Sequence, residues 1–377
     1  MAFIRGLRLL LPLPLVFSGL ICEARPLFTE PPRSSSGISE DSIGEQLRTV
    51  TPASLPALTE RAERDDIEAQ CILAVAYSEG IQLPHDDQKG VKWLQRAATH
   101  GIVWIQNRLG AMYHLGSGTS RNDKEAVKWF RTAAEQHDPG AATNLAFMYT
   151  QGYGVRQDYT AAAKWYRLAA EQGYAIAQNN LGVLYHYGLG VPRDYAQALA
   201  WYRAAAQQGS VTSATGLGIL YEQGLGVVHN YPEALRWLKV AATEQDPVAE
   251  AELAKMYDLG LGTPRDLHMA ADLYLRSAVQ GYAPAQHRVG QLYASGLGVP
   301  LDYISAYVWL TLAARAGHEG CKQEADNLAH VMTPKQRDEA EIRLDLEDQI
   351  VRKTTSIFEM KGKARGLVVK EKLAPAL

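Results

Sequence analysis

The stretch AQNNLGVLYHYGLGVPRDYAQALAWYRAAAQQG, residues 177–209, contains a pattern that the chain repeats every 36 residues. Its tyrosine, first glycine and aspartate (Tyr185, Gly188 and Asp194) each have a counterpart in six further copies. The tyrosine column, for example, continues as Tyr77, Tyr113, Tyr149, Tyr221, Tyr257 and Tyr293. Seven copies in one register predict an array of a single structural unit.

The first half of each unit has the spacing of a helix with one apolar face. Ala177, Leu181, Leu184 and Tyr185 occupy positions i, i+4, i+7 and i+8, which fall on the same side of a helix. A small residue follows the leucine in every copy: Ala74, Gly110, Ala146, Gly182, Gly218, Ala254 and Gly290. Glycine costs a helix about 1 kcal/mol relative to alanine. Its recurrence therefore predicts that a second helix approaches closely at this point.

The second half of each unit begins after a Gly-x-Gly pair, Gly188 and Gly190 in the quoted copy. Glycine adopts a positive φ easily, so the pair predicts the end of the first helix. The Asp or Asn that follows is suited to the N-cap of a second helix. We expect that helix to bury one face, formed by Ala198, Trp201, Ala205 and Ala206. Trp201 recurs in five other copies, at Trp93, Trp129, Trp165, Trp237 and Trp309, with Leu273 in the remaining one.

The pattern resembles that of the Sel-one-like repeats, relatives of the tetratricopeptide repeat, which read A-x-x-x-L-G-x-x-Y-x-x-G-x-G-V-x-x-D-x-x-x-A-x-x-W-x-x-x-A-A-x-x-G. The resemblance covers residues 67–318 column by column. Neither helix of a unit can bury its apolar face alone, so neighbouring units must stack. The expected fold is an all-α, α/α superhelix (solenoid) of seven 36-residue helix-turn-helix repeats with helical caps. The resemblance implies an adaptor in protein complexes and no particular reaction.

The N-terminal residues 1–24 have the layout of a secretory signal, with Arg5 and Arg8, a short apolar run, and small residues near Ala24. A lipoprotein would instead use Cys22 as its acylated residue, but the bulky Ile21 before it argues against this. The chain contains no Asn-x-Ser/Thr acceptor, which favours a bacterial periplasm over a eukaryotic lumen. We therefore expect an exported protein, periplasmic or secreted, with no stable membrane insertion after cleavage.

The remaining flanks predict a tether, two caps and a tail. Residues 25–53 are rich in proline and serine and predict a disordered linker. Residues 54–66 match the second half of a unit and predict an N-terminal capping helix. Residues 319–352 predict C-terminal capping helices, the last of them starting after Thr333 in a capping-box arrangement. Residues 353–377 predict a basic tail.

No motif predicts a reaction, a cofactor or a metal. The Gly-x-Gly turns follow no strand and precede no Gly-Lys-Ser/Thr, so they do not predict a nucleotide site. His114 and His186 share a column but belong to units too far apart to share a metal, and His-x-x-x-His and Cys-x-x-Cys spacings are absent. Cys71 and Cys321 lie at opposite ends of the array. The net charge of −3 also argues against a nucleic-acid partner.

The variable columns of the first helices remain as a binding surface. In tetratricopeptide-like superhelices the first helices line the concave face, and repeat proteins bind partners through columns that vary. A merely solvated face is the alternative for any single residue. The candidate partner-binding residues are Arg108, Asn144, Phe147, Asn180, Tyr187, Glu252, Lys255 and Arg288.

Two classes of function follow. The leading hypothesis is a non-enzymatic scaffold of the bacterial cell envelope that binds an unidentified protein or peptide on the concave face. The alternative is a secreted enzyme that binds or hydrolyses β-lactams, as the resemblance to cysteine-rich members of the family implies. Those members brace each repeat with a cysteine pair, and this sequence has none at those positions.

Overall fold

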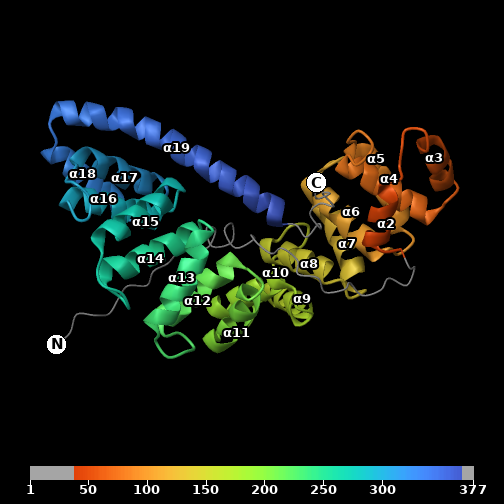
Figure 1. The fold of residues 1–377 in the computed structure, drawn as a ribbon, viewed down its shortest axis with the longest axis horizontal. Helices are drawn as coiled ribbons and strands as arrows, with labels where there is room; N and C mark the ends of the chain where they lie inside the picture. The colour runs from red at the N-terminus through yellow and green to blue at the C-terminus, as the bar shows by residue number, and fades with distance from the viewer. Residues whose placement is uncertain (1–37, 367–377) are drawn as a thin grey trace. The chain divides into compact units, whose positions relative to one another are not determined.

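The structure is a computed structural model that describes residues 38–366, with side chains to residue 356. Within this range it is built of helices α2 to α19 and has no strand (Figure 1). The predicted signal segment, residues 1–24, lies outside the described residues, as do residues 25–37 and 367–377. The all-α repeat fold predicted from the sequence is confirmed.

Each of the seven repeats is a pair of helices. The first helices are α4 (Ile67–Glu79), α6 (Val103–Leu115), α8 (Pro139–Gln151), α10 (Ala175–Tyr187), α12 (Val211–Gln223), α14 (Pro247–Leu259) and α16 (Ala283–Ser295). The second helices are α5 (Asp87–Ala98), α7 (Asp123–Ala134), α9 (Tyr159–Glu171), α11 (Tyr195–Ala206), α13 (Tyr231–Thr243), α15 (Leu267–Val279) and α17 (Tyr303–Arg315).

The chain divides into two compact units, residues 38–193 and residues 194–366. The first unit carries the first three repeats and the first helix of the fourth. The second unit begins with α11 and carries the later repeats and the C-terminal helices. In each unit the helices of the repeats pack against the helix before and the helix after, so each core is built from neighbouring repeats.

The predicted caps of the repeat helices are confirmed. Every first helix ends at a glycine in the left-handed conformation, such as Gly188 with φ +70°. Every second helix begins at an Asp or Asn whose side chain accepts a backbone N–H, as Asp194 does from Ala196 and Gln197. These side chains satisfy donors at the helix N-terminus that have no partner within the helix.

The deepest column of the second helices differs from the predicted one. Trp201 is half-buried, as are Trp129, Trp165 and Trp237, whereas Trp93 and Trp309 are buried. The residue after the tryptophan is buried in every repeat: Leu94, Phe130, Tyr166, Tyr202, Leu238, Tyr274 and Leu310. Successive helix residues are about 100° apart around the axis. The helix is therefore turned so that this second column, rather than the tryptophan, faces the first helix.

This column explains the small residue of the first helices. A Cβ added to Gly110 would lie 2.7 Å from the ring of Phe130, and one added to Gly218 would lie 2.5 Å from Leu238. A Cβ at Gly290 would lie 2.7 Å from Leu310. The close helix approach predicted from the glycines is therefore present in both units.

The second glycine of each Gly-x-Gly turn makes the contact between repeats. A Cβ on Gly118 would lie 2.1 Å from the carbonyl oxygen of Asp87, and one on Gly154 would lie 2.2 Å from that of Asp123. Each contact falls on the first residue of the preceding repeat's second helix. Only a residue without a side chain allows the backbones to approach this closely.

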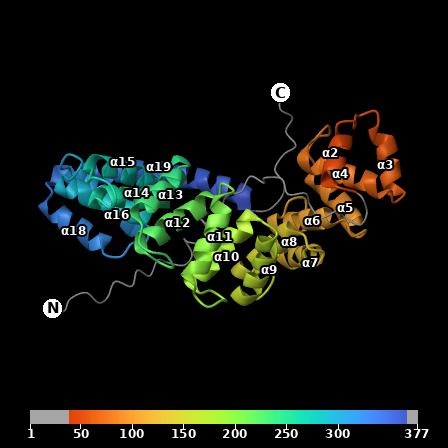
Figure 2. The ribbon, with the colours of Figure 1, turned by 60° about the horizontal axis from the view of Figure 1, so that its bottom comes forward.

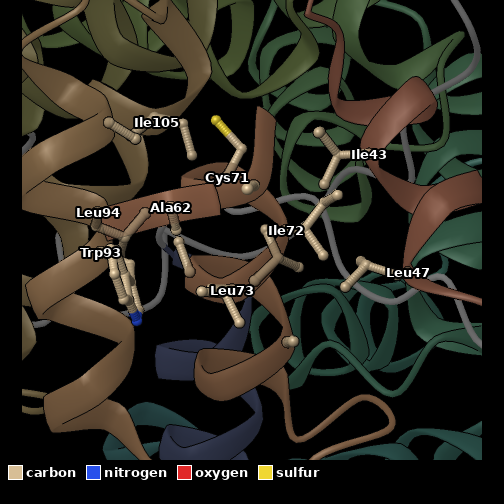
Figure 3. Packing of buried hydrophobic residues seen from close by; sticks show 14 of the residues in the cluster. Ile43, Leu47, Ala62, Cys71, Ile72, Leu73, Trp93, Leu94 and Ile105 are labelled. Carbon is tan, nitrogen blue, oxygen red and sulfur yellow. The ribbon is translucent and has the colours of Figure 1, made fainter. Parts of the chain in front are cut away.

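The N-terminal end of the array includes more of the chain than the sequence predicts. Residues 40–47, assigned above to a disordered linker, form α2 (Glu40–Leu47), capped by Ser39. Ile43 and Leu47 lie one turn apart on this helix and pack toward Ile72 of α4 (Figure 3). Helix α3 (Leu55–Glu63) buries Leu58 and Ala62. Both helices cover apolar surface of α4, which no earlier repeat is present to cover.

The C-terminal end consists of α18 (Cys321–Val331) and α19 (Pro334–Gly366). The long α19 lies alongside α17 and reaches α15 (Figures 1 and 2). It buries Ala340, Leu344 and Val351. The sequence placed its end near residue 352, but the helix continues to Gly366. None of the helices within residues 38–366 combines the length and apolarity needed to cross a bilayer.

Candidate binding face of the first helices

The candidate residues Arg108 and Asn144 take part in contacts between neighbouring first helices. The guanidinium of Arg108, on α6, donates to Ser78 and pairs with Glu79 at the end of α4. The amide of Asn144, on α8, donates to Asn107 Oδ1 of α6 at 2.9 Å. Arg108 is 9% exposed and Asn144 is 2% exposed. Both residues therefore brace the stack and present little surface to a partner.

Phe147 lies in an aromatic cluster at the ends of two first helices. Its ring meets His114 and Tyr153 edge-on, with centroid separations of 6.0 and 5.9 Å. The guanidinium of Arg121 lies 5.2 Å from the centroid of the Tyr153 ring. Next to His114, Leu115 is 57% exposed. The group of Phe147, His114, Tyr153 and Arg121 is called the aromatic cluster below.

The charges beside the aromatic cluster are paired. His114 Nδ1 lies 2.7 Å from a carboxylate oxygen of Asp123, and Arg121 pairs with the other oxygen at 2.8 Å. Burial raises the pKa of Asp123, but the hydrogen bonds from Arg121 and His114 outweigh it and hold that pKa below its usual value. The carboxylate is thus ionised at neutral pH and holds the side chains of His114 and Arg121 in place.

Asn180 and Tyr187 lie on the next first helix, α10. The Asn180 side-chain oxygen accepts from Asn179 at 3.2 Å. Tyr187 is 41% exposed and stacks on His186, with centroids 4.6 Å apart and an interplanar angle of 18°. Burial lowers the pKa of His186 to about 4, so its imidazole is neutral at pH 7. Tyr187 therefore exposes an aromatic ring that is stacked on a neutral imidazole.

In the unit of residues 194–366 the candidate residues form ion pairs between first helices. Lys255 of α14 pairs with Glu252 of its own helix and with Glu222 of α12, the latter at 3.3 Å. Arg288 of α16 pairs with the buried carboxylate of Asp258 of α14 at 2.6 Å. These contacts repeat the arrangement of Arg108 and Glu79, in which a charge on one first helix is held by the helix before it.

The structure thus separates the predicted residues into two groups. Arg108 and Asn144 are buried, whereas Phe147, Asn180, Tyr187, Glu252, Lys255 and Arg288 retain exposed surface. Sequence reasoning missed Leu115 and the 61% exposed Leu259, which share the column of Tyr187 at the last position of a first helix. A leucine directly before the glycine that ends a first helix is the sequence pattern that could have predicted this exposed apolar position.

The tyrosine column has a structural role. Its hydroxyls accept from the side chain two positions after the tryptophan column, as in Arg131 to Tyr149 at 2.9 Å and Arg203 to Tyr221 at 2.6 Å. Gln95 makes the same bond to Tyr113. The tyrosines are half-buried, apart from the buried Tyr221. They join the second helix of one repeat to the first helix of the next, which accounts for their recurrence without a ligand.

The sequence matches the Sel1 repeat family in seven segments, residues 67–102, 106–138, 139–174, 175–210, 211–246, 247–282 and 283–318. The chain belongs to this family. Sel1 repeats are generally a non-catalytic scaffold for interactions between proteins. The cysteines within the described residues, Cys71 and Cys321, are buried and free.

Several solved structures are similar. A Sel1 repeat protein from Oxalobacter formigenes is 30% identical with a TM-score of 0.60, over 65% of this chain and 96% of that one. The protective antigen c5321 of uropathogenic Escherichia coli is 24% identical over 86% of this chain and 91% of its own, with a TM-score of 0.46. The immunity protein Pa5087 of Pseudomonas aeruginosa is 21% identical over 58% and 83%, with a TM-score of 0.38. No curated protein matches the sequence.

Proposed function

We propose that the protein is a non-enzymatic adaptor that binds a peptide or protein partner on the face formed by its first helices, which we expect to be the concave face. The observation that carries this proposal is the aromatic cluster together with Tyr187. Both combine exposed apolar surface with side chains that are already fixed by their neighbours.

Physical chemistry supports this choice of surface. Aromatic residues bury a large area with few rotatable bonds and are enriched among the residues that dominate binding energy. The ion pair of Asp123 with Arg121 holds the cluster before any partner arrives, so less conformational freedom is lost on binding. Arg121 also offers a cation beside Tyr153. An extended peptide with an apolar side chain next to a carboxylate would fit this surface.

The second unit offers a different, charged surface. Lys255, Glu252, Glu222 and Arg288 lie on consecutive first helices and retain exposed surface. Such pairs add specificity and orientation more than affinity. We assign the anchoring of the partner to the aromatic cluster and Tyr187, and the choice between partners to the charged residues.

We also propose that the protein acts in the bacterial cell envelope. The support is the signal-like layout of residues 1–24, together with the absence of Asn-x-Ser/Thr acceptors. Fractionation of cells that express the full chain tests this directly. Protein found in the cytoplasm with its first 24 residues intact would contradict it.

Site-specific photo-crosslinking tests the binding face. A photoreactive amino acid is placed at position 147 or 187 in the native host, and matched controls carry it at Val228 or Val240, which are exposed but lie on a turn and a second helix. We expect one shared crosslinked partner from positions 147 and 187 and none from the controls. Crosslinks only from the controls would move the binding surface away from the first helices.

A further inference from the structure

Three metal-ligating side chains meet at the C-terminal end of the array. His287 lies on α16, His318 lies in the turn after α17, and Cys321 is the first residue of α18. One donor atom from each lies within 4.8 Å of the others. His318 Nδ1 is 3.3 Å from Cys321 Sγ, and the rings of His287 and His318 are 4.7 Å apart.

These distances suit a tetrahedral metal ion. Zinc binds histidine nitrogen at about 2.0 Å and thiolate sulfur at about 2.3 Å, so two ligands on a tetrahedral ion lie roughly 3.5 Å apart. The pair of His318 and Cys321 already has this separation. The third donor needs to move by only about 1 Å, which the half-buried His287 can do by a small ring rotation.

The surroundings of the cluster also fit a metal site. The carboxylate of Glu324, one turn after Cys321, lies 2.9 Å from His287 Nε2. Gln291 Nε2 lies 2.9 Å from the same nitrogen. Metal-bound histidines commonly have a carboxylate that orients the ring. Cys321 is buried at the start of α18 after Gly320, so its sulfur is held in place by the backbone.

We propose that His287, His318 and Cys321 bind one zinc ion, or a similar divalent transition-metal ion, with Glu324 orienting His287. Nitrogen and sulfur donors together select zinc-type ions over magnesium or calcium. The ion would join α16 of the last repeat to α18, and so fasten the C-terminal cap to the array. Binding displaces the thiol proton of Cys321 to solvent, because the ligand is the thiolate.

The spacing of residues along the chain does not reveal this site. Sequence motifs for metal binding place two ligands at a short, fixed spacing such as His-x-x-x-His or Cys-x-x-Cys. Here His318 and Cys321 form a mixed pair, and His287 comes from an earlier helix that the fold brings alongside.

Cobalt(II) titration of the reduced, chelator-treated full-length protein tests the proposal, since cobalt replaces zinc and reports thiolate ligation by a charge-transfer absorption. We expect one cobalt per chain with this absorption and with visible bands of a four-coordinate ion. Cys321→Ser should abolish the charge-transfer absorption. His287→Asn or His318→Asn should weaken cobalt binding at least tenfold, and Glu324→Gln about tenfold with the absorption retained.

Matched controls distinguish this site from adventitious binding. Cys71→Ser removes the other described cysteine, and His330→Asn removes an exposed histidine of α18; neither should change the titration. Circular dichroism before cobalt addition establishes that each variant is folded, and zinc should raise the melting temperature of the wild type but not of His318→Asn. No charge-transfer absorption in the wild type, or one that is unaffected by both histidine substitutions, would overturn the proposal.

Discussion

At the scale of single residues, four positions other than glycine have a positive φ within residues 38–366: Asp65, Gln82, His137 and Gln245. His137 and Gln245 stand where other repeats have the glycine that ends the second helix. A side chain in this conformation costs about 1 kcal/mol or more. These two repeats thus carry a local strain that their neighbours lack.

Substituting His137→Gly should therefore stabilise the protein. The relief of strain is partly offset by the greater freedom of glycine in the unfolded chain, so we expect a gain of about 0.5–1 kcal/mol in the free energy of unfolding. Urea denaturation measures the gain. Glu135→Gly, two residues earlier at φ −65°, is the control and should destabilise. A loss of stability in His137→Gly would show that the imidazole makes a contact worth more than the strain.

The two aromatic residues of α7 provide a second residue-scale prediction. Phe130 is fully buried against Gly110, whereas Trp129 is half-buried. Phe130→Ala should cost about 3–5 kcal/mol because it leaves a cavity that the stack cannot close. Trp129→Ala should cost clearly less. Equal costs in chemical denaturation would mean that the tryptophan column is as much a part of the core as the column beside it.

Trp129 and Phe130 also show which feature of the second helix the sequence does not predict. The repeat predicts the helices and their order correctly, but it predicts the tryptophan column as the buried one, and the column after it is buried more deeply. The rotation of the second helix is set by packing against the glycine of the first helix, at Gly110 for Phe130. The tryptophan column is nearly constant, whereas the neighbouring column varies between Leu, Phe and Tyr, so its residue types alone do not mark it as the deeper one.

At the scale of elements, the N-caps of two first helices are carboxylates in poorly solvated positions. Asp138 caps α8 by accepting from Ala141, and Asp246 caps α14 by accepting from Ala249. Burial raises the pKa of both, that of Asp138 to about 6. For Asp138 the folded state therefore binds a proton that the unfolded state has released between about pH 4 and pH 6. The contribution of Asp138 to stability falls as the pH rises through this window.

Asp138→Asn tests this contribution, since asparagine caps a helix as well as aspartate does and has no charge. At pH 7.5 the variant should be more stable than the wild type by about 1 kcal/mol, a conservative fraction of the shift in pKa. At pH 4 the two proteins should be equally stable. Urea denaturation at both pH values measures this. A variant that is less stable at pH 7.5 would mean that the charge at the helix N-terminus outweighs its burial.

The glycines of the turns give a second prediction at this scale. Gly154 and Gly173 both have a positive φ, but a Cβ on Gly154 would overlap the backbone at Asp123, while one on Gly173 would meet nothing within 4 Å. Alanine adopts a positive φ less easily than glycine, so both Ala variants should lose about 1 kcal/mol of the free energy of unfolding. Gly154→Ala should lose about 1–3 kcal/mol more because two repeats must separate. Equal losses would show that backbone conformation alone explains both glycines.

The flanking elements were harder to predict than the repeats. Helix α2 has only Ile43 and Leu47 as a buried pair, which is too little apolar pattern to predict a helix amid proline and serine. It forms because α4 offers an uncovered apolar surface, a tertiary cause that no local pattern encodes. For α19 the sequence predicts the start after Thr333 but not the extension beyond residue 352.

At the scale of the whole molecule, helices contact their neighbours in the chain, and the main exceptions within the described residues involve the caps. Stability in such an array is a sum of repeat terms and nearest-neighbour terms. A destabilising substitution should then unfold the helices around it and leave distant repeats folded. The two compact units, residues 38–193 and residues 194–366, give this locality a natural boundary.

Leu310→Ala tests the locality, because Leu310 is buried in α17 against Gly290 and lies far along the chain from the N-terminal cap. Hydrogen–deuterium exchange followed by mass spectrometry compares the variant with the wild type. We expect faster exchange in α16 to α19, a smaller change in α14 and α15, and no change in α4 to α7. The reason is that each repeat contacts only its neighbours, so the lost stability affects the nearest helices most. Phe130→Ala is the matched lesion in the other unit and should give the reverse distribution. If either substitution accelerated exchange evenly over residues 38–366, the chain would unfold as one cooperative body and the nearest-neighbour description would fail.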